Sequence, residues 1–381
     1  MNGYLGFRLR PNRKARRTGR IDLRETHAHL LPSGTERSRP EHQVNHTNRR
    51  LPLSLALPGL LAGALVGCGP TDEAADANRT YVIKFPHVTA PGTPKGQAAE
   101  RFKELAEARF PSQVTVEIYP SSQLMNDDDS LEALAFGEIQ MIAVSLSKFD
   151  RLTQKFQVFD LPFLFPDLNA VERFQNSQTG AELLTELVDS GFLGLGFWHN
   201  GMKHFSGPIP LHHPDDAAGL KFRIMESDVL QAQVLAIGGN PQKMAFGEVY
   251  QALQTGAIDA QENTWSNIYS SKFYEVQDYV METNHGYIGY LVAVNPQFWQ
   301  GLPDDIRLGL EEVMADVTAW GNAQSETINQ EARGKVAAEG RGEILDLTPE
   351  QLARWQEAMY PVWEQFSDDI GAERIAAASG Q

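Results

Sequence analysis

The sequence contains a single cysteine among its 381 residues. One thiol excludes an internal disulfide, a multi-thiolate zinc site and a Cys-x-x-Cys redox motif. The chain also lacks the GxSxG, HExxH, P-loop and GxGxxG motifs that mark several large enzyme classes. We therefore predict no catalytic residue, no cofactor and no metal site.

Positive charge is the second shortage. The chain has 33 Lys and Arg against 49 Asp and Glu, a formal net charge of −16. Residues 1–67 hold 12 basic and 4 acidic residues, a net charge of +8, so residues 68–381 carry −24. Such an acidic chain repels the phosphate backbone, and we predict no nucleic-acid partner. With 42% hydrophobic residues it is long enough to build two domains.

A long hydrophobic run is also missing. Leu51–Gly67 is apolar and uncharged, but its 17 residues include two prolines and are too short for a comfortable membrane span. Because a basic pair precedes it, the segment is typical of a secretory signal peptide. Its end, Leu65-Val66-Gly67-Cys68, resembles a bacterial lipobox and predicts a lipid anchor on Cys68. The alternative is a chance cysteine behind a signal peptide.

The segments on either side of this signal differ in character. Residues 1–48 show no hydrophobic periodicity and are rich in Arg, Pro, Asn and His, which predicts disorder. We interpret them as an over-extended start, so that residues 1–67 comprise this start and the signal peptide. Residues 68–79 are polar and rich in Ala and Asp, which predicts a tether.

Strand and helix patterns alternate beyond the tether and indicate an α/β fold. The predicted strands are Tyr81–Phe85, Val114–Tyr119, Ile139–Val144, Leu193–Trp198, Leu220–Ile224 and Tyr287–Val294. The predicted helices between them are Gly96–Arg109, Ser130–Phe136, Ala181–Asp189, Asp228–Ile237 and Glu248–Thr255. A long helical pattern follows within Pro296–Gly340, as a helix along both lobes or on one surface, and Thr348–Gln365 adds an amphipathic helix.

One twelve-residue pattern occurs twice. Residues 131–142 (LEALAFGEIQMI) and 250–261 (YQALQTGAIDAQ) share Ala, Leu, Gly and Ile at one offset. Each is interpreted as a helix that ends at a glycine and leads into a strand, which predicts one architecture used in two lobes. Since ligands in such sheets bind beyond the carboxyl ends of strands, the repeat nominates Ser145 and residues 263–265 for a shared cleft.

Two polar clusters are explained without a metal. His199, His204, His212 and His213 are close in sequence, but their spacings fit no single helical face. The acidic triplet Asp127–Asp129 opens a predicted helix, where carboxylates complement the helix dipole and cap free N–H groups. Neither pattern changes the prediction that the chain has no metal site.

Arg223 is unusual because it lies inside a short apolar strand, where an unpaired guanidinium is costly. It would either form an internal salt bridge or present a planar fork to a ligand carboxylate. The segment Glu262–Trp265 ends another strand with an amide and an indole. It is either a capped turn with a core tryptophan or a polar wall of the cleft.

The order and spacing of several segments are distinctive: Pro94–Gly96, Phe159–Phe165, Gly219–Arg223, Asn240-Pro241, Phe246–Gly256, Gln261–Tyr269, Glu275–Gln277 and Asn284–Tyr287. On these segments, and from about Tyr81 to Gln365, the chain resembles the substrate-binding subunit of TRAP (tripartite ATP-independent periplasmic) transporters, the DctP-like family. The resemblance implies a two-lobed binding protein that closes like a flytrap, with a long helix spanning both lobes. Residues 80–200 and 289–328 would form lobe I, and residues 201–288 and 329–381 lobe II.

The resemblance also implies roles for individual residues. Arg223 stands where the family has its carboxylate clamp, Asn263 would add a hydrogen bond to the same carboxylate, and Phe246 would pack against the ligand. A second basic residue follows an Asn-Gly pair in this family. Here it is Lys203, where sialic-acid-type members have arginine, which disfavours a sialic-acid ligand.

The sequence QENTWSNIY at 261–269 is most similar to members that take C4-dicarboxylates. Lys95 and His87, on the first strand-to-helix loop, would then hold the distal carboxylate, and Ser145 would donate a hydrogen bond. The alternative for Lys95 is an exposed lysine at a helix start.

The resemblance predicts a monomeric extracytoplasmic protein that captures a small organic-acid anion such as succinate, malate or fumarate. It would deliver this anion to the membrane subunits of a TRAP transporter and would not be an enzyme. One alternative is a secreted enzyme acting on small organic acids, which a nucleophile–base pair in the cleft would favour. The other is a ligand sensor for a membrane receptor.

Overall fold

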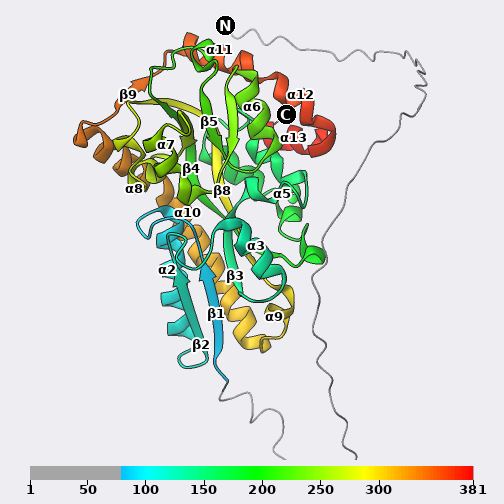
Figure 1. Ribbon diagram of the computed structural model, residues 1–381. Helices are drawn as coiled ribbons and strands as arrows, with labels where there is room; N and C mark the ends of the chain where they lie inside the picture. The colour runs from blue at the N-terminus through cyan, green and yellow to red at the C-terminus, as the bar shows by residue number, and fades with distance from the viewer. Residues whose placement is uncertain (1–78, 381) are drawn as a thin grey trace, which may run out of the picture. The chain divides into compact units, whose positions relative to one another are not determined.

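The computed structural model describes residues 79–380 (Figure 1). The predicted signal peptide, the lipid anchor at Cys68 and residues 68–78 of the tether lie outside the described residues. The described part belongs to one compact unit. Among its helices, none is both long and apolar enough to cross a membrane.

The first elements form a small layer around two parallel strands. Local signals set its helices: Thr93 caps α2 by accepting a hydrogen bond from the Gly96 N–H, and Asn126 caps α3 in the same way through the Asp129 N–H. The elements are β1 (Tyr81–Pro86), α2 (Pro94–Arg109), β2 (Val114–Tyr119), α3 (Asp127–Ala135) and β3 (Met141–Ser145). Strand β1 pairs with β2 in register from Tyr81 opposite Val114.

A seven-stranded mixed sheet forms the centre, in the order β3-β8-β4-β7-β5-β6, with β9 also paired to β8. Its remaining strands are β4 (Leu193–Gly207), β5 (Lys221–Ile224), β6 (Asn240–Lys243), β7 (Ala260–Asn263), β8 (Tyr279–Val294) and β9 (Glu343–Asp346). Strands β4 and β8 are antiparallel and much longer than the predicted Leu193–Trp198 and Tyr287–Val294. They continue because each finds a second set of partners, β7 for β4 and β9 for β8.

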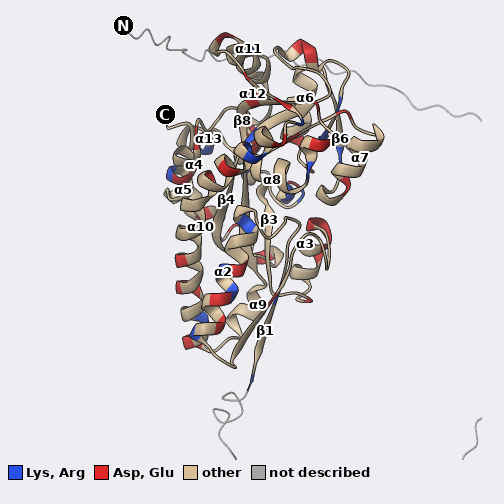
Figure 2. Cartoon of the chain, turned by 90° about the vertical axis from the view of Figure 1, so that its left-hand side faces the viewer, with Lys and Arg blue, Asp and Glu red and all other residues tan. Residues whose placement is uncertain are grey.

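Helices surround this sheet. The further helices are α4 (Leu168–Gln175), α5 (Gln178–Leu183), α6 (Asp228–Ala236), α7 (Val249–Thr255), α8 (Trp265–Ser270), α9 (Pro296–Gln300), α10 (Asp304–Glu339), α11 (Pro349–Met359), α12 (Pro361–Ile370) and α13 (Ala372–Ser379). Short 3₁₀ turns at Leu146–Phe149 and Lys155–Asp160 follow β3. Acidic residues recur along α10 (Figure 2).

The 36-residue helix α10 spans the described unit. It packs against α2 at one end and α8 at the other, and crosses β4 between them. Trp198 donates from its indole to the Thr318 hydroxyl at 2.9 Å, and Asn329 donates to the Asn200 carbonyl at 2.6 Å. The prediction of a long helix along both lobes is therefore confirmed, and the single-lobe alternative is wrong.

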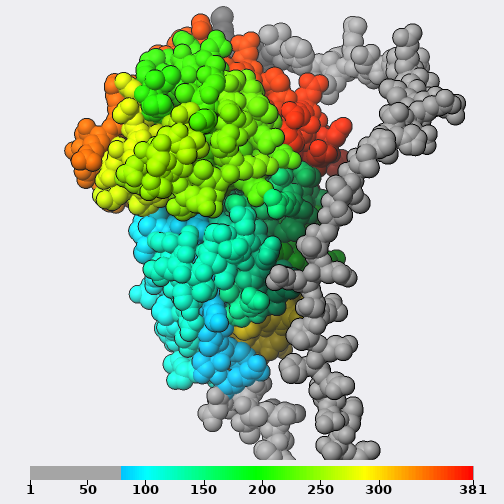
Figure 3. All heavy atoms as spheres, viewed as in Figure 1, coloured from blue at the N-terminus to red at the C-terminus, as the bar shows by residue number. Residues whose placement is uncertain are grey.

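The predicted two-lobed α/β fold is visible in the grouping of the elements. Figure 1 shows β1, β2, α2, α3 and α9 at one end and α7, α8, α11 and β9 at the other. In the space-filling view, the cyan residues of the first group meet the green and yellow residues of the second along a boundary across the middle (Figure 3). The predicted lobe borders at 200/201, 288/289 and 328/329 fall inside β4, β8 and α10, and remain predictions.

Three helix predictions need correction. The predicted helix Ala181–Asp189 is wrong because α5 ends at Leu183 and a turn follows. In Pro296–Gly340 a short helix, α9, precedes α10, and Pro303 occupies the N-cap position between them. Thr348–Gln365 is divided between α11 and α12, because Pro361 lacks the N–H that would continue the first helix.

The repeated pattern is confirmed. Gly137 follows α3 with φ +77°, and Gly256 follows α7 with φ +70°. Both positions favour glycine because a left-handed backbone is strained for residues with a Cβ. Each glycine precedes a strand, and these strands, β3 and β7, end at Ser145 and Asn263.

Candidate functional site

Four of the predicted ligand-binding residues line one cavity: Arg223, Asn263, Phe246 and Ser145. Its walls come from both ends of the described unit, with the α3 and β3 region on one side and β5, β7 and α8 on the other. The cavity volume between them is about 30 Å³, so the two walls lie close together. The other lining residues are Val88, Thr89, Asp127, Asp128, Lys148, Met225, Ala245, Asn267, Ile288 and Tyr290.

Arg223 is 3% exposed and is held by the backbone. Its Nε and Nη2 atoms donate to the Met244 carbonyl at 3.0 and 2.8 Å. Its guanidinium forms no ion pair within the described residues, so the predicted alternative of an internal salt bridge is wrong. Burial lowers the pKa of Arg223 to about 10, which still leaves the group charged at neutral pH. The Phe246 ring lies 6.0 Å from the guanidinium carbon.

Asn263 is fixed by a small amide network. Its Nδ2 donates to Gln261 Oε1 at 3.2 Å, and its Oδ1 accepts from Asn267 Nδ2 at 2.8 Å. The second N–H of the Asn263 amide has no hydrogen-bond partner in the described chain. The Asn267 Oδ1 atom is buried without a hydrogen-bond partner as well. Because buried polar groups are nearly always paired, these two amides are suited to a polar ligand.

Lys95 is fully buried beside the cavity, not exposed at a helix start as the alternative held. Its Nζ donates to the Ala143 carbonyl at 3.0 Å and lies 3.9 Å from the centre of the Tyr290 ring. Tyr290 lines the cavity and accepts a hydrogen bond from Asn200 Nδ2 at 2.7 Å. Burial lowers the pKa of Lys95 to about 8. Lys95 therefore places its charge behind the cavity wall.

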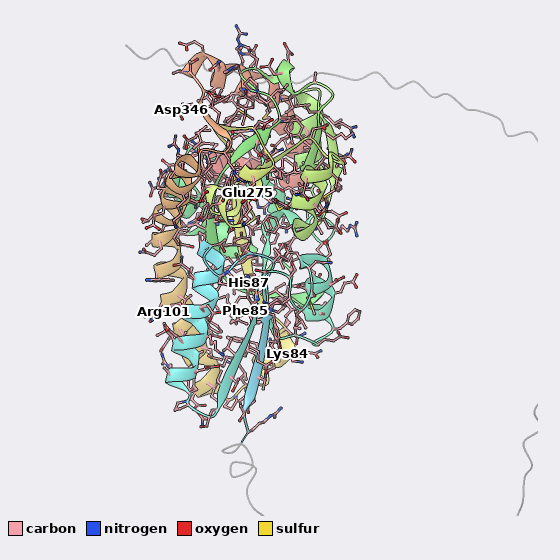
Figure 4. All side chains as sticks on the ribbon, turned by 60° about the vertical axis from the view of Figure 1, so that its left-hand side comes forward. Lys84, Phe85, His87, Arg101, Glu275 and Asp346 are labelled. Atoms are coloured by element: carbon pink, nitrogen blue, oxygen red, sulfur yellow. The ribbon has the colours of Figure 1, made fainter. Side chains whose placement is uncertain are left out.

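His87 lies just after β1, at the end of that strand nearest the middle of the described unit (Figure 4). It is 2% exposed, and its Nε2 atom has no hydrogen-bond partner among the described residues. Burial, and next the charge of Lys95, lower the pKa of His87 to about 3, so its ring is neutral. The two residues that follow it, Val88 and Thr89, line the cavity.

The structure does not bring Lys203 to the cavity. Its Nζ pairs with Glu262 Oε1 at 2.8 Å, and the other oxygen of Glu262 contacts His285 Nε2 at 2.8 Å. All three side chains are 3% exposed or less. Glu262 is buried, but Lys203 and His285 outweigh that effect and lower its pKa to about 2. We assign Lys203 to an internal ion pair, in correction of the predicted ligand contact.

The cavity also has six polar lining residues that the sequence did not predict as ligand contacts: Thr89, Asp127, Asp128, Lys148, Asn267 and Tyr290. Asp127 begins α3 as predicted, but its side chain is also buried in the cavity wall. The acidic triplet carried no signal of this, because any carboxylate at a helix start satisfies the same dipole argument. Tyr290 lies opposite Ser145 in the β3–β8 pairing, a register that only the fold defines.

The clustered histidines have separate surroundings. His199 contacts the Tyr287 hydroxyl at 2.7 Å, whereas His204 packs against the Trp265 ring. His212 and His213 precede a 3₁₀ turn at Pro214–Ala217. A larger cavity of about 450 Å³ is lined by His199 and His204, but by none of the seven predicted ligand residues. The smaller cavity is the better candidate because a buried cation and incompletely paired amides converge there.

Comparison with known proteins supplies the class of this chain. Residues 85–369 match the family described as bacterial extracellular solute-binding protein, family 7 (DctP). The C4-dicarboxylate-binding periplasmic protein DctP of Shewanella loihica is 49% identical over 315 residues, which cover 83% of this chain and 93% of the relative. DctP of Rhodobacter capsulatus is 47% identical over 321 residues, covering 83% and 96%.

A solved structure of comparable similarity is a TRAP periplasmic solute-binding protein of Shewanella oneidensis with bound succinate. It is 47% identical with a TM-score of 0.78, and the match covers 79% of this chain and 99% of that one. A Pseudomonas aeruginosa protein with bound L-malate is 44% identical with a TM-score of 0.73, covering 74% and 99%. The chain belongs to the DctP family of extracellular solute-binding proteins, and the predicted resemblance is confirmed.

Proposed function

We propose that the protein captures a C4-dicarboxylate and delivers it to the membrane subunits of a TRAP transporter. The observation that carries the proposal is Arg223, a buried guanidinium that faces a cavity and forms no ion pair among the described residues. Relatives at 46–49% identity are named C4-dicarboxylate-binding proteins, and similar structures hold succinate and L-malate. A buried cation without an anion is costly, and a ligand carboxylate removes that cost.

The ligand would be held from both sides of the cavity. Arg223 and Asn263 would bind one carboxylate with N–H groups that have no other partner, while Phe246 packs on the carbon chain. Ser145 would donate from the opposite wall, and Lys95 would offset the charge of the second carboxylate. Since these groups belong to both predicted lobes, a bridging ligand would favour the closed arrangement.

His87 is the weakest of the proposed contacts. Its ring is neutral, so it would contribute a hydrogen bond through Nε2 and no charge. This atom has no other partner in the described chain, which supports the role.

The cellular setting is proposed from the family and the sequence together. We infer an extracytoplasmic monomer that has no enzymatic activity and is anchored by lipid on Cys68. The lobes would be residues 80–200 with 289–328, and residues 201–288 with 329–381. Mass spectrometry of the membrane-extracted protein tests the anchor, since a lipid adduct on an N-terminal Cys68 peptide is the expected product.

Isothermal titration calorimetry tests the binding proposal directly. Succinate and L-malate are expected to bind, and butyrate, which lacks one carboxylate, to bind far more weakly. Replacing Arg223 with Ala should cost about 2–5 kcal/mol, a factor of roughly 30 to several thousand in affinity. Arg223→Lys should recover only part of it, because an ammonium cannot reproduce the planar fork.

Arg101→Ala is the matched control, since Arg101 lies on the surface of α2 in an exposed ion pair with Glu104 (Figure 4). This variant should bind like the parent. Near-native affinity in both Arg223 variants would refute the clamp. No heat with any dicarboxylate would refute the ligand class.

A further inference from the structure

Asp127 is an unexpected neighbour for an anion. This carboxyl group lines the same cavity as Arg223 and Asn263, yet its oxygens form no ion pair in the described chain. It is the first residue of α3, and its side chain is buried. A dicarboxylate in the cavity would therefore lie against a protein carboxylate.

The groups around Asp127 determine the net charge of the site. Lys148 is neutralised by Asp128, whose two oxygens accept from its Nζ at 2.9 and 2.7 Å. Tyr290 is a neutral phenol, because burial raises its pKa further. The charged or titratable groups that face Asp127 are Lys95 from α2, Arg223 from β5, Lys148 from the 3₁₀ turn after β3, Asp128 from α3 and Tyr290 from β8.

Of the three cations that face Asp127, Lys95 and Arg223 therefore have no carboxylate of the described chain within ion-pair distance. With Asp127 ionised, the site carries one net positive charge. A dianion would change this to one net negative charge, whereas a dianion together with one proton would leave the site neutral. In a buried site an uncompensated charge is expensive, and two carboxylates in contact raise each other's pKa.

We propose that Asp127 takes up one proton from solvent when a C4-dicarboxylate dianion binds, and that the resulting carboxylic acid donates a hydrogen bond to a ligand oxygen. Ligand capture would then be coupled to proton uptake. This inference rests on the proposed function. Burial already raises the pKa of Asp127 in the free protein, although Lys95 and Lys148 oppose the effect.

The coupling has a consequence that requires no variant. Titration of succinate at pH 7.0 in phosphate, imidazole and Tris, which differ in heat of ionisation, gives the number of protons bound per ligand. We expect between about one half and one proton, and an affinity that falls up to roughly tenfold per pH unit between pH 6.5 and 7.5. Lys95 contributes less than Asp127 at pH 7.0, because its pKa of about 8 leaves it mostly protonated there.

Asp127→Asn assigns the proton to this side chain, because the amide imitates the neutral acid but cannot titrate. Its affinity should equal or exceed that of the parent at pH 7.0, with no proton uptake and no pH dependence from 6.5 to 7.5. Asp129→Asn is the matched control: Asp129 belongs to the same acidic triplet, but it is exposed and lies outside the cavity. This control should keep the parental uptake.

The calorimetric results can overturn the proposed proton uptake in two ways. Succinate binding by the parent without proton uptake would overturn it while leaving the proposed function intact. Uptake that persists in Asp127→Asn would place the proton elsewhere, on the ligand, on His87 or on Lys95, and would overturn it too. If succinate and L-malate fail to bind in every buffer, the proposed function itself fails.

Discussion

Lys203 can serve either as a ligand contact or as a partner in an internal ion pair. The variant Lys203→Met distinguishes these two roles. The substitution keeps an unbranched side chain of similar length but leaves the Glu262 carboxylate buried with only His285 beside it. Removing one partner of a buried ion pair typically costs 3–5 kcal/mol. The 2.8 Å contact and near-complete burial of both side chains place this pair in that class. Against a total stability on the order of 5–15 kcal/mol, the loss is large.

Urea unfolding of the parent and of Lys203→Met measures this cost. Adding Glu262→Gln should restore part of the stability, since the double variant leaves no carboxylate buried without its lysine and its amide can still contact His285. A coupling free energy of the expected size would identify the pair as the origin of the loss. The folded fraction of Lys203→Met should still bind succinate within a few-fold of the parent.

The opposite pattern would refute the reasoning. If Lys203→Met changed the free energy of unfolding by less than about 1 kcal/mol and lowered succinate affinity a hundredfold, Lys203 would be a ligand group. The family resemblance, which implies a basic ligand contact at this position, would then be right about Lys203.

Two further predictions concern stability. Asn329→Ala removes two buried hydrogen bonds between α10 and its neighbours and a third within α10, and should cost about 1–3 kcal/mol in urea unfolding. Gln330→Ala, on the exposed side, should cost far less, and equal losses would contradict this. His204 has its pKa lowered to about 3 by burial first and by His285 and Arg333 next, so its stabilising effect is complete above pH 6.5 and declines as the pH falls. His204→Gln should therefore lose about 2 kcal/mol less than the parent between pH 7.5 and 5.0; identical losses would count against it.

Local sequence patterns predicted several residues of the cavity. Arg223 was recognisable because it is a single arginine in an apolar strand, where a buried charge is costly unless an anion pairs with it. The repeated helix–glycine–strand pattern predicted that Ser145 and Asn263 end two strands of one cleft, and both line the cavity. These inferences succeeded because they depend on neighbouring residues and on strand direction.

The remaining parts depend on contacts between distant segments. Lys203 faces Glu262 because β4 pairs with β7, and Tyr290 faces Ser145 because β3 pairs with β8. The extra length of β4 and β8 has the same origin, since a strand continues as long as a partner supplies hydrogen bonds. No pattern within a single segment contains this information.

The sequence by itself determined the α/β class, the family and the acidic character of the chain, and it nominated Arg223 as the cation for a ligand carboxylate. Only the tertiary structure decided which charges cancel each other. It joined Lys203 to Glu262, buried Lys95 under Tyr290 and placed Asp127 in the cavity wall. The reason is physical: the cost of a charge depends on its neighbours in space, and those neighbours come from strands and helices far apart in the chain.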